Sequence, residues 1–172
     1  GHSPFRPAGL VHTMLKRVAP YGISGFLYYQ GEEDARHAWR YEALLTSLIR
    51  HWRTLFLDAE LPFLFVQLPM YRLGNEADDF SWPLLRDAQA RVAQSCRNTA
   101  MAVLIDAGEL NNIHPADKKT VGKRLYLQAL CHVYGRDVAA DSPRARDAYP
   151  EGQTMIVRLN ARVTCSGEAA FP

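Results

Sequence analysis

Apolar runs and helical periodicities alternate along most of the chain. Three short apolar runs predict buried strands, and the residues between them place apolar positions at three- and four-residue steps, which is typical of one helix face. The predicted strands are 23–30, 62–69 and 99–108, and the predicted helices are 34–57, 82–95 and 115–135. Strands that alternate with helices in this way favour an α/β fold with a parallel sheet and right-handed crossovers.

Particular residues indicate where these helices begin and end. Asp34 is a suitable N-cap for the first helix. Pro115 suits the first turn of the last helix, which places His114 beside its N-cap. Gly135 suits the left-handed position that follows a helix. The sequence therefore predicts that the α/β part of the chain ends near residue 135.

The pattern changes after residue 135. Residues 136–152 are rich in turn-forming residues, and residues 153–165 alternate between apolar and polar positions like an exposed strand. We therefore divide the chain into an α/β part, 1–135, and a turn-rich segment with the start of a β-rich region, 136–172.

Polar segments follow each predicted strand. Ligands of open α/β sheets bind beyond the carboxyl ends of the strands. Three segments are expected at that edge: "QGEED" (30–34), "QLPMYR" (67–72) and "DAGELNNIHP" (106–115). We expect these segments to line one cleft.

His114 is the first candidate for chemistry in this cleft. The positive end of a helix dipole disfavours the imidazolium form, so a histidine there is suited to act as a general base. Asp106 and Glu109 precede it in the same loop and are candidate carboxylates to orient it. The alternatives are a surface or capping role for His114 and loop or capping roles for the two acids.

Gln30 is the second candidate. A side-chain amide at a strand end can donate a hydrogen bond to a developing oxyanion. Gly31 follows it, and Glu32 is placed either to orient Gln30 or a substrate, or simply to begin a helix with favourable charge. The alternative for Gln30 is an ordinary polar residue at the end of a strand. Together, the candidates suggest a hydrolase-like cleft.

Composition narrows the classes of partner. The 172 residues are 48% hydrophobic and 22% charged, which is typical of globular proteins, and a net charge of +2 is too small to argue for nucleic acid. No apolar run reaches the ~18 residues of a membrane span. The histidines and cysteines show no metal-ligand spacing, so we expect no metal. No signal peptide is recognisable at the start of the sequence.

Several blocks of the sequence resemble, in the same order, the sialate O-acetylesterase family of SGNH-type carbohydrate esterases. The blocks are "ISGFLYYQGEEDA", "YEALLTSLIRHWR", "LPFLFVQLP", "WPLLRDAQ" and "MAVLIDAGELNNIHPADKKTVGKRL". The resemblance covers roughly residues 7–135. It implies a flavodoxin-like three-layer α/β fold and the removal of O-acetyl groups from sugars, typically sialic acid, through an acyl-enzyme on serine, without a cofactor.

The resemblance also implies roles for individual residues. His114 matches the histidine of the family's "IHP" motif, the base that takes the serine proton and later activates water. Gln30 matches the glutamine of "YQGE", which is associated with the oxyanion site, and Glu32 matches the glutamate that supports this loop. Family members of this kind are secreted, periplasmic or lysosomal, and the sequence does not select among these compartments.

The sequence departs from the family pattern at three points. The family's serine lies in a "GQSN"-type motif upstream of "YQGE", and no such motif precedes it here; Ser3 is too close to the start. The glycine oxyanion block upstream is also missing. Many SGNH enzymes carry aspartate three residues before the histidine, where this chain has Asn111. We therefore expect a partial domain that lacks its N-terminal strands and that pairs with the missing N-terminal half.

Three functional hypotheses remain open. The first is a sialate-type O-acetylesterase whose nucleophilic serine lies outside this chain. The second is an acetylxylan-type esterase with the same chemistry, in which "YRLGNEADDFS" (71–81) is a candidate loop for reading the sugar. The third is a non-catalytic α/β module that binds glycans or serves as a subunit.

Overall fold

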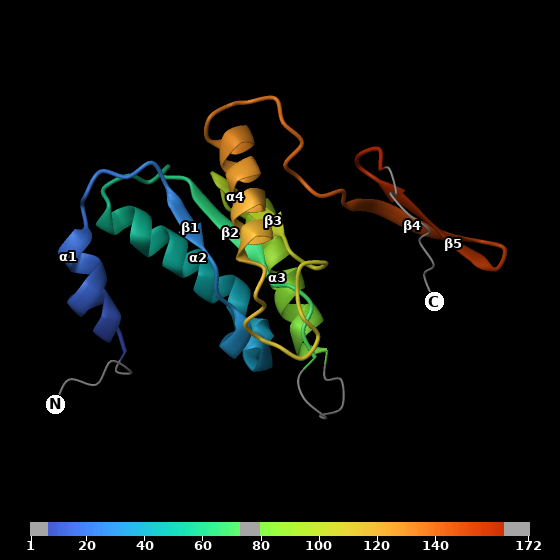
Figure 1. The fold of residues 1–172 in the computed structure, drawn as a ribbon, viewed down its shortest axis with the longest axis horizontal. Helices are drawn as coiled ribbons and strands as arrows, with labels where there is room; N and C mark the ends of the chain where they lie inside the picture. The colour runs from blue at the N-terminus through green and yellow to red at the C-terminus, as the bar shows by residue number, and fades with distance from the viewer. Residues whose placement is uncertain (1–6, 73–79, 164–172) are drawn as a thin grey trace. The chain divides into compact units, whose positions relative to one another are not determined.

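The alternating pattern folds into a three-stranded parallel sheet with helices on both faces (Figure 1). The computed structural model describes residues 7–72 and 80–163. Its strands are β1 (Phe26–Tyr28), β2 (Phe63–Gln67) and β3 (Thr99–Val103), in the order β1-β2-β3. Phe26 lies opposite Phe63, which lies opposite Thr99. The predicted α/β class and the parallel sheet are confirmed.

The strands are shorter than the apolar runs predict. β1 begins only after Gly25, which has a φ of +154° and packs so closely on Pro62 that a Cβ would lie 2.9 Å from the Pro62 carbonyl oxygen. β3 ends at Val103 because the chain turns directly afterwards, where the Ala107 N–H donates to the Leu104 carbonyl at 2.9 Å. Asp106 therefore lies in a turn beyond the strand.

Helices α2 (Ala38–Leu55) and α3 (Ser81–Ser95) cover one face of the sheet, and α4 (Lys118–His132) covers the other. The first face buries Phe26, Phe63, Phe65, Met101, Tyr41, Leu45, Ile49, Leu85 and Val92. The second face buries Leu64, Val66, Ala100, Ala102, Leu104, Val121 and Leu125. Both faces of β2 are thus covered, which explains its continuous apolar sequence. Full burial of one such side chain contributes about 1.5–3 kcal/mol.

The helix starts predicted from the sequence are wrong in two places. Asp34 is not the N-cap of α2, because Glu32–His37 forms a separate 3₁₀ helix, η2, before α2 begins at Ala38. Pro115 does not begin α4 either. Asp117 is its N-cap and accepts a hydrogen bond from the Thr120 N–H at 3.0 Å. An aspartate cap outcompetes the proline signal because its carboxylate satisfies a free N–H of the first turn.

A helix also precedes the sheet. Val11–Leu15 forms a π-helical segment, η1, and α1 (Lys16–Val18) continues it. After α4, which ends at His132, Gly135 has the expected left-handed conformation, with a φ of +61°.

The amino edge of the sheet is held by one buried cation. Arg53 of α2 is 8% exposed, and its guanidinium donates to the carbonyls of Leu61, Arg97 and Asn98 at 2.9–3.0 Å. These carbonyls lie just before β2 and β3. One side chain therefore ties α2 to the entry of two strands.

The chain divides into two units, one ending at Ala140 and one beginning at Asp141. In the second unit, β4 (Ala145–Glu151) and β5 (Thr154–Leu159) form an antiparallel hairpin that turns at Gly152, where φ is +61°. The strand expected in 153–165 is present, but β4 falls within 136–152, where the sequence predicted only turns. The sequence gives no sign of β4 because all of its residues are exposed, so they include charged residues and Pro150 and show no alternation of apolar and polar positions.

Candidate functional site

Gln30 lies where the chain leaves β1, at the carboxyl edge of the sheet, and its side chain is fixed by three neighbours. The Tyr28 hydroxyl donates to Gln30 Oε1 at 3.1 Å, and Gln30 Nε2 donates to Asp34 Oδ2 at 2.7 Å. The Tyr41 hydroxyl of α2 donates to the Gln30 backbone carbonyl at 2.8 Å and also lies 3.3 Å from Gln30 Oε1. The amide therefore has one orientation, with its oxygen toward tyrosine hydroxyls and one N–H toward Asp34.

The two tyrosines act as donors in this network. Burial raises the pKa of Tyr28 to about 12, and the nearby carboxylates of Asp34 and Glu32 add to the shift. Burial also raises the pKa of Tyr41, as do Tyr28 and the same two carboxylates, against a hydrogen bond with Gln89 that lowers it. Both hydroxyls therefore keep their protons at neutral pH and can donate hydrogen bonds to Gln30.

Gly31 packs the loop onto α3 and the exit of β2. Its φ is +151°, and a Cβ on it would lie 3.0 Å from Leu85 Cδ2 and 3.3 Å from both Leu68 Cδ1 and Gln89 Nε2. A side chain here would be strained and would push against well-packed neighbours. Glu32 follows in the first turn of η2, half-buried, and its main electrostatic effect within the described residues is on the tyrosines.

Gln89 of α3 joins the ends of two strands beneath this loop. Its side chain is 0% exposed, Nε2 donates to the Gln30 carbonyl at 3.3 Å, and Oε1 accepts from the Leu68 N–H at 2.9 Å. Sequence reasoning missed Gln89, Tyr28 and Tyr41. Gln89 could have been recognised as a glutamine on an otherwise apolar helix face. A buried side-chain amide normally has hydrogen-bond partners, so its presence there indicates groups that it bonds.

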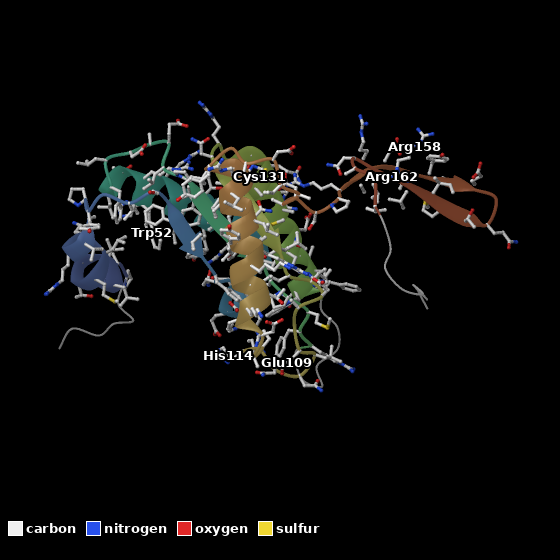
Figure 2. All side chains as sticks on the ribbon, turned by 45° about the horizontal axis from the view of Figure 1, so that its top comes forward. Trp52, Glu109, His114, Cys131, Arg158 and Arg162 are labelled. Carbon is white, nitrogen blue, oxygen red and sulfur yellow. The ribbon has the colours of Figure 1, made fainter. Side chains whose placement is uncertain are left out.

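The loop that carries His114 is organised by Glu109. Glu109 Oε1 accepts from the Ala116 N–H at 2.6 Å, and Oε2 accepts from Asn112 Nδ2 at 3.0 Å. Asn112 Oδ1 in turn accepts from the His114 backbone N–H at 3.0 Å. Figure 2 shows Glu109 and His114 near the start of α4, at the opposite end from Cys131. One carboxylate therefore ties both flanks of the histidine.

The charge on Glu109 is favoured by these contacts. The Ala116 N–H lowers the pKa of Glu109 most, and the Asn112 amide lowers it further. The carboxyl is therefore ionised in neutral solution, as the loop geometry requires. Glu109 itself is exposed, so its hydrogen bonds compete with water.

Asp106 is engaged elsewhere. Its two oxygens pair with Arg124 of α4, at 2.5 Å from Nη1 to Oδ1 and 2.7 Å from Nη2 to Oδ2. Arg124 also donates to the Val103 carbonyl at 2.6 Å. The hydrogen bond from Arg124 lowers the pKa of Asp106. Asp106 thus ties the exit of β3 to α4.

The structure joins Gln30 to Tyr28, Asp34, Tyr41 and Gln89 in one network, with Gly31 packed beside it. Within the described residues Asp34, and not Glu32, is the carboxylate that bonds the Gln30 amide. Glu109 and His114 lie in one loop. The structure does not join Asp106 to His114. Among the residues that the structure describes, the exposed His114 imidazole has no hydrogen-bond or ion-pair partner. His114 does not lie beside the N-cap of α4 as predicted, because α4 begins at Lys118, three residues later than expected, with Asp117 as its N-cap.

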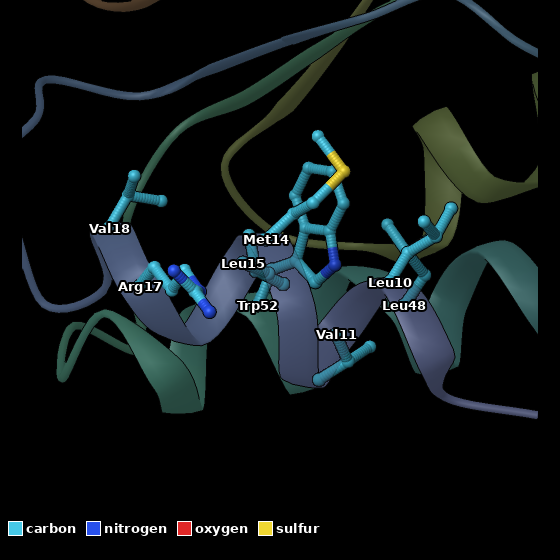
Figure 3. A pocket seen from close by; sticks show the side chains of 8 residues that line it. All are labelled: Leu10, Val11, Met14, Leu15, Arg17, Val18, Leu48 and Trp52. Carbon is cyan, nitrogen blue, oxygen red and sulfur yellow. The ribbon is translucent and has the colours of Figure 1, made fainter. Parts of the chain in front are cut away.

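Two hollows lie near this part of the fold. A small one of about 140 Å³ lies beside Gln30 and is lined by Tyr28, Gln30, Asp34, Tyr41, Leu44, Leu45 and Leu48. A larger, almost wholly apolar one of about 650 Å³ lies between the N-terminal helix and α2 (Figure 3). Its lining residues are Leu10, Val11, Met14, Leu15, Arg17, Val18, Leu48 and Trp52. The larger hollow offers packing surface rather than chemistry.

Some sequence predictions fall on other parts of the chain. Most of the proposed sugar-reading loop 71–81 and the N-terminal Ser3 lie outside the described residues. Within 7–72 and 80–163, no helix has the length and apolarity to cross a membrane. The same residues contain no group of three or more His, Cys, Asp or Glu side chains arranged to hold a metal ion.

A family model described as carbohydrate esterase, sialic acid-specific acetylesterase, matches residues 8–130. Among curated relatives, the sialate O-acetylesterase of Mus musculus is 33% identical over 148 residues, which are 77% of this chain and 27% of the relative. The sialate O-acetylesterase of Homo sapiens is 29% identical over 149 residues, covering 77% and 28%. This chain thus spans about a quarter of the length of these relatives.

A solved structure agrees with these matches. The crystal structure of a carbohydrate acetylesterase from Xanthomonas citri superposes with a TM-score of 0.80 at 32% identity, covering 88% of this chain and 35% of that one. The matched region contains both the Gln30 network and the His114 loop. The chain belongs to the family of sialic acid-specific carbohydrate acetylesterases.

Proposed function

We propose that this chain supplies the histidine-bearing part of a carbohydrate O-acetylesterase that hydrolyses acetyl esters of sialic acid or a related sugar. The observation that carries the proposal is that a fixed amide at Gln30 and an exposed imidazole at His114 lie in segments that follow two strands of one parallel sheet, in a chain of the acetylesterase family. Acyl transfer on serine requires a base and an oxyanion donor, and these two groups suit those roles.

His114 is the proposed general base. It takes the proton of a serine hydroxyl as the hydroxyl attacks the acetyl carbonyl, and it returns that proton to the departing sugar oxygen. It then takes a proton from water as the water attacks the acetyl-enzyme, and it gives that proton to the serine oxygen as acetate leaves. In this proposal the nucleophilic serine is supplied by a part of the protein that lies outside this sequence. The exposed position of His114, without a protein partner for its imidazole among the described residues, is consistent with a ring that meets a serine and a substrate.

Gln30 is the proposed oxyanion donor. One of its two Nε2 hydrogens is held by Asp34, and the other remains for the tetrahedral intermediate. Because Tyr28 fixes the amide oxygen, the amide does not need to reorganise when charge develops on the substrate. Gly31 gives the loop the close packing that this geometry needs, and Glu32 supports it.

The two carboxylates have different proposed roles. Glu109 is a positioning residue, since its oxygens hold the residues on both sides of His114. Asp106 positions the start of the same loop through Arg124. In this arrangement the imidazole relies on the loop backbone for its orientation.

Acetate release from 9-O-acetylated sialic acid, measured beside acetylated xylan, tests the proposal. The assay uses the whole natural polypeptide that contains this sequence, with His114→Ala and the control His51→Ala. His51 is an exposed histidine on α2, two residues from Arg53, whose side chain contacts the residues just before β2 and β3, at the amino edge of the sheet. We expect wild type and His51→Ala to release acetate from the sialic acid, and His114→Ala to lose roughly a hundredfold to ten-thousandfold in kcat.

The results separate the functional hypotheses. Faster acetate release from acetylated xylan than from acetylated sialic acid would identify an acetylxylan-type esterase that uses the same catalytic residues. No release from either sugar by the wild-type protein would favour a non-catalytic glycan-binding or subunit role. A kcat equal to that of wild type in His114→Ala would show that His114 is not the general base.

A further inference from the structure

Two glutamines are buried in this fold, and they differ in what they hold. Gln89 is 0% exposed and Gln128 is 1% exposed. Gln128 of α4 donates to the Ala140 carbonyl at 2.7 Å, on the segment that leaves the helix. Gln89 instead bonds the residues that leave two neighbouring strands. Burial of an amide without partners is costly. Within the described residues Gln128 Oε1 is buried with no hydrogen-bond partner, whereas both ends of the Gln89 amide are bonded.

The bonds of Gln89 continue the sheet beyond its last backbone pairs. The ladder between β1 and β2 ends at Tyr28 and Phe65. Gln30 lies two residues past Tyr28, and its carbonyl accepts from Gln89 Nε2. Leu68 lies three residues past Phe65, just after β2, and its N–H donates to Gln89 Oε1. A side-chain amide thus presents one donor and one acceptor, as a peptide group of a strand would. The two chain segments can separate here without leaving these groups unpaired.

Separation of strand ends is what a cleft at the carboxyl edge requires. The segment that leaves β1 carries Gln30, and Gln89 Nε2 also lies 3.3 Å from the position of a Cβ on Gly31. A shift of Gln89 would therefore be felt first at the Gln30–Gly31 turn. The Tyr41 hydroxyl holds the same carbonyl from α2, so two helices fix one backbone oxygen.

We propose that Gln89 is a positioning residue of the acetylesterase site, which holds the Gln30–Gly31 turn against the exit of β2 and so sets the place of the Gln30 amide. This inference rests on the proposed function. Gln89 touches no reacting atom. Its effect is on how well the oxyanion donor is aimed, and an error of about 1 Å in such a position can cost a hundredfold in rate.

The test compares Gln89→Met and Gln89→Asn with Gln128→Met in the whole natural polypeptide. Methionine matches the size of glutamine and removes both hydrogen bonds, and asparagine keeps an amide that is too short to span the gap. We expect both Gln89 variants to lose roughly tenfold to a hundredfold in kcat, with KM within about twofold of wild type. Gln128→Met removes one hydrogen bond and one buried oxygen that has no partner within the described residues, and it should leave kcat within about twofold. Gln89→Asn serves as the test if Gln89→Met does not fold.

Hydrogen exchange gives a second measurement that does not depend on activity. The Leu68 amide should exchange at least tenfold faster in the Gln89 variants, and the Ala102 amide in β3 should serve as the unchanged reference. If the wild-type protein releases no acetate, the proposed function fails, and unchanged exchange at Leu68 would then overturn the positioning role separately. Equal losses of kcat in the Gln89 and Gln128 variants would reduce Gln89 to a contributor to stability and overturn the inference.

Discussion

The two loops of the candidate site are built in opposite ways. The Gln30 loop is packed against α2 and α3 and held by hydrogen bonds from half-buried Tyr28 and from buried Tyr41 and Gln89. The His114 loop is mostly exposed and is held at the surface by hydrogen bonds from Ala116 and Asn112 to Glu109, and by the Arg72 N–H, which donates to the Leu110 carbonyl at 2.8 Å. A buried network fixes a dipole before the substrate arrives, whereas an exposed loop leaves its imidazole accessible. The proposed oxyanion donor is thus the rigid partner, and the proposed base is the accessible one.

This contrast predicts that changes in the Gln30 loop act on folding and activity together, and that changes in the His114 loop act mainly on activity. The largest effect is expected at Gly31. Gly31→Ala places a Cβ 3.0–3.3 Å from side chains of Leu85, Leu68 and Gln89 at a φ of +151°. The free energy of unfolding, measured by urea denaturation, should fall by about 2–4 kcal/mol.

Gly122→Ala is the matched control for that change. Gly122 lies within α4 and a Cβ there would meet nothing within 4 Å. Alanine should raise the free energy of unfolding by about 0.5–1 kcal/mol, because it has the higher helix propensity. Similar losses at both glycines would show that the Gln30 loop is not tightly packed.

The next effect in size is expected at Tyr41. Tyr41→Phe removes the hydroxyl that donates to the Gln30 carbonyl and keeps the ring in the core. Urea denaturation should show a loss of about 1–2 kcal/mol, since a buried hydrogen bond is lost. Tyr126→Phe, at a tyrosine that is 60% exposed, should stay within about 0.5 kcal/mol of wild type. A loss at Tyr126 equal to that at Tyr41 would contradict the buried network.

Glu109→Gln sharpens the other side of the comparison. The new amide cannot accept from both Ala116 and Asn112, because one of its two terminal atoms is a donor. We expect kcat for acetate release to fall about three- to tenfold, through misplacement of His114, with Tm almost unchanged. The control is Glu33→Gln at an exposed position of η2, which should leave kcat and Tm unchanged. A large fall in Tm for Glu109→Gln would show that the His114 loop matters to folding.

The smallest effect concerns Asp106 and depends on pH. Arg124 lowers the pKa of Asp106 in the folded protein, so the pair stabilises the fold above the ordinary aspartate pKa, and this contribution disappears as the pH falls through the lowered value. Asp106→Asn should therefore cost at most about 1 kcal/mol at pH 7, since both side chains are partly exposed. The difference from wild type should shrink as the pH falls below about 4. A difference that grows on acidification would have the wrong sign.

The sequence allowed the sheet and its helices to be predicted, because apolar runs and helical periodicity report burial directly. It also predicts that the segments carrying Gln30 and His114 leave the same edge of the sheet, since that follows from parallel strands alone. It did not locate the start of α4, where Asp117 competes with Pro115, nor the exposed strand β4, which has no apolar alternation. The donors that hold Gln30 were missed because Tyr41 and Gln89 lie 11 and 59 residues away in sequence.

The carboxylates show a further limit. Asp106 and Glu109 are equally good candidates in a sequence, because both are acids shortly before His114. Only the three-dimensional contacts separate them: Asp106 pairs with Arg124, 18 residues away on α4, and Glu109 bonds within its own loop. Long-range ion pairs leave no local pattern in a single sequence.

The most direct test of the account is chemical rescue at the exposed imidazole. His114→Gly in the whole natural polypeptide leaves a space at the surface that free imidazole can reach. We predict that this variant releases acetate from 9-O-acetylated sialic acid at least a hundredfold more slowly than wild type, and that added imidazole restores part of the rate. The control His51→Gly should release acetate at the wild-type rate without added imidazole. Undiminished release by His114→Gly without imidazole would contradict the central claim that His114 is the base.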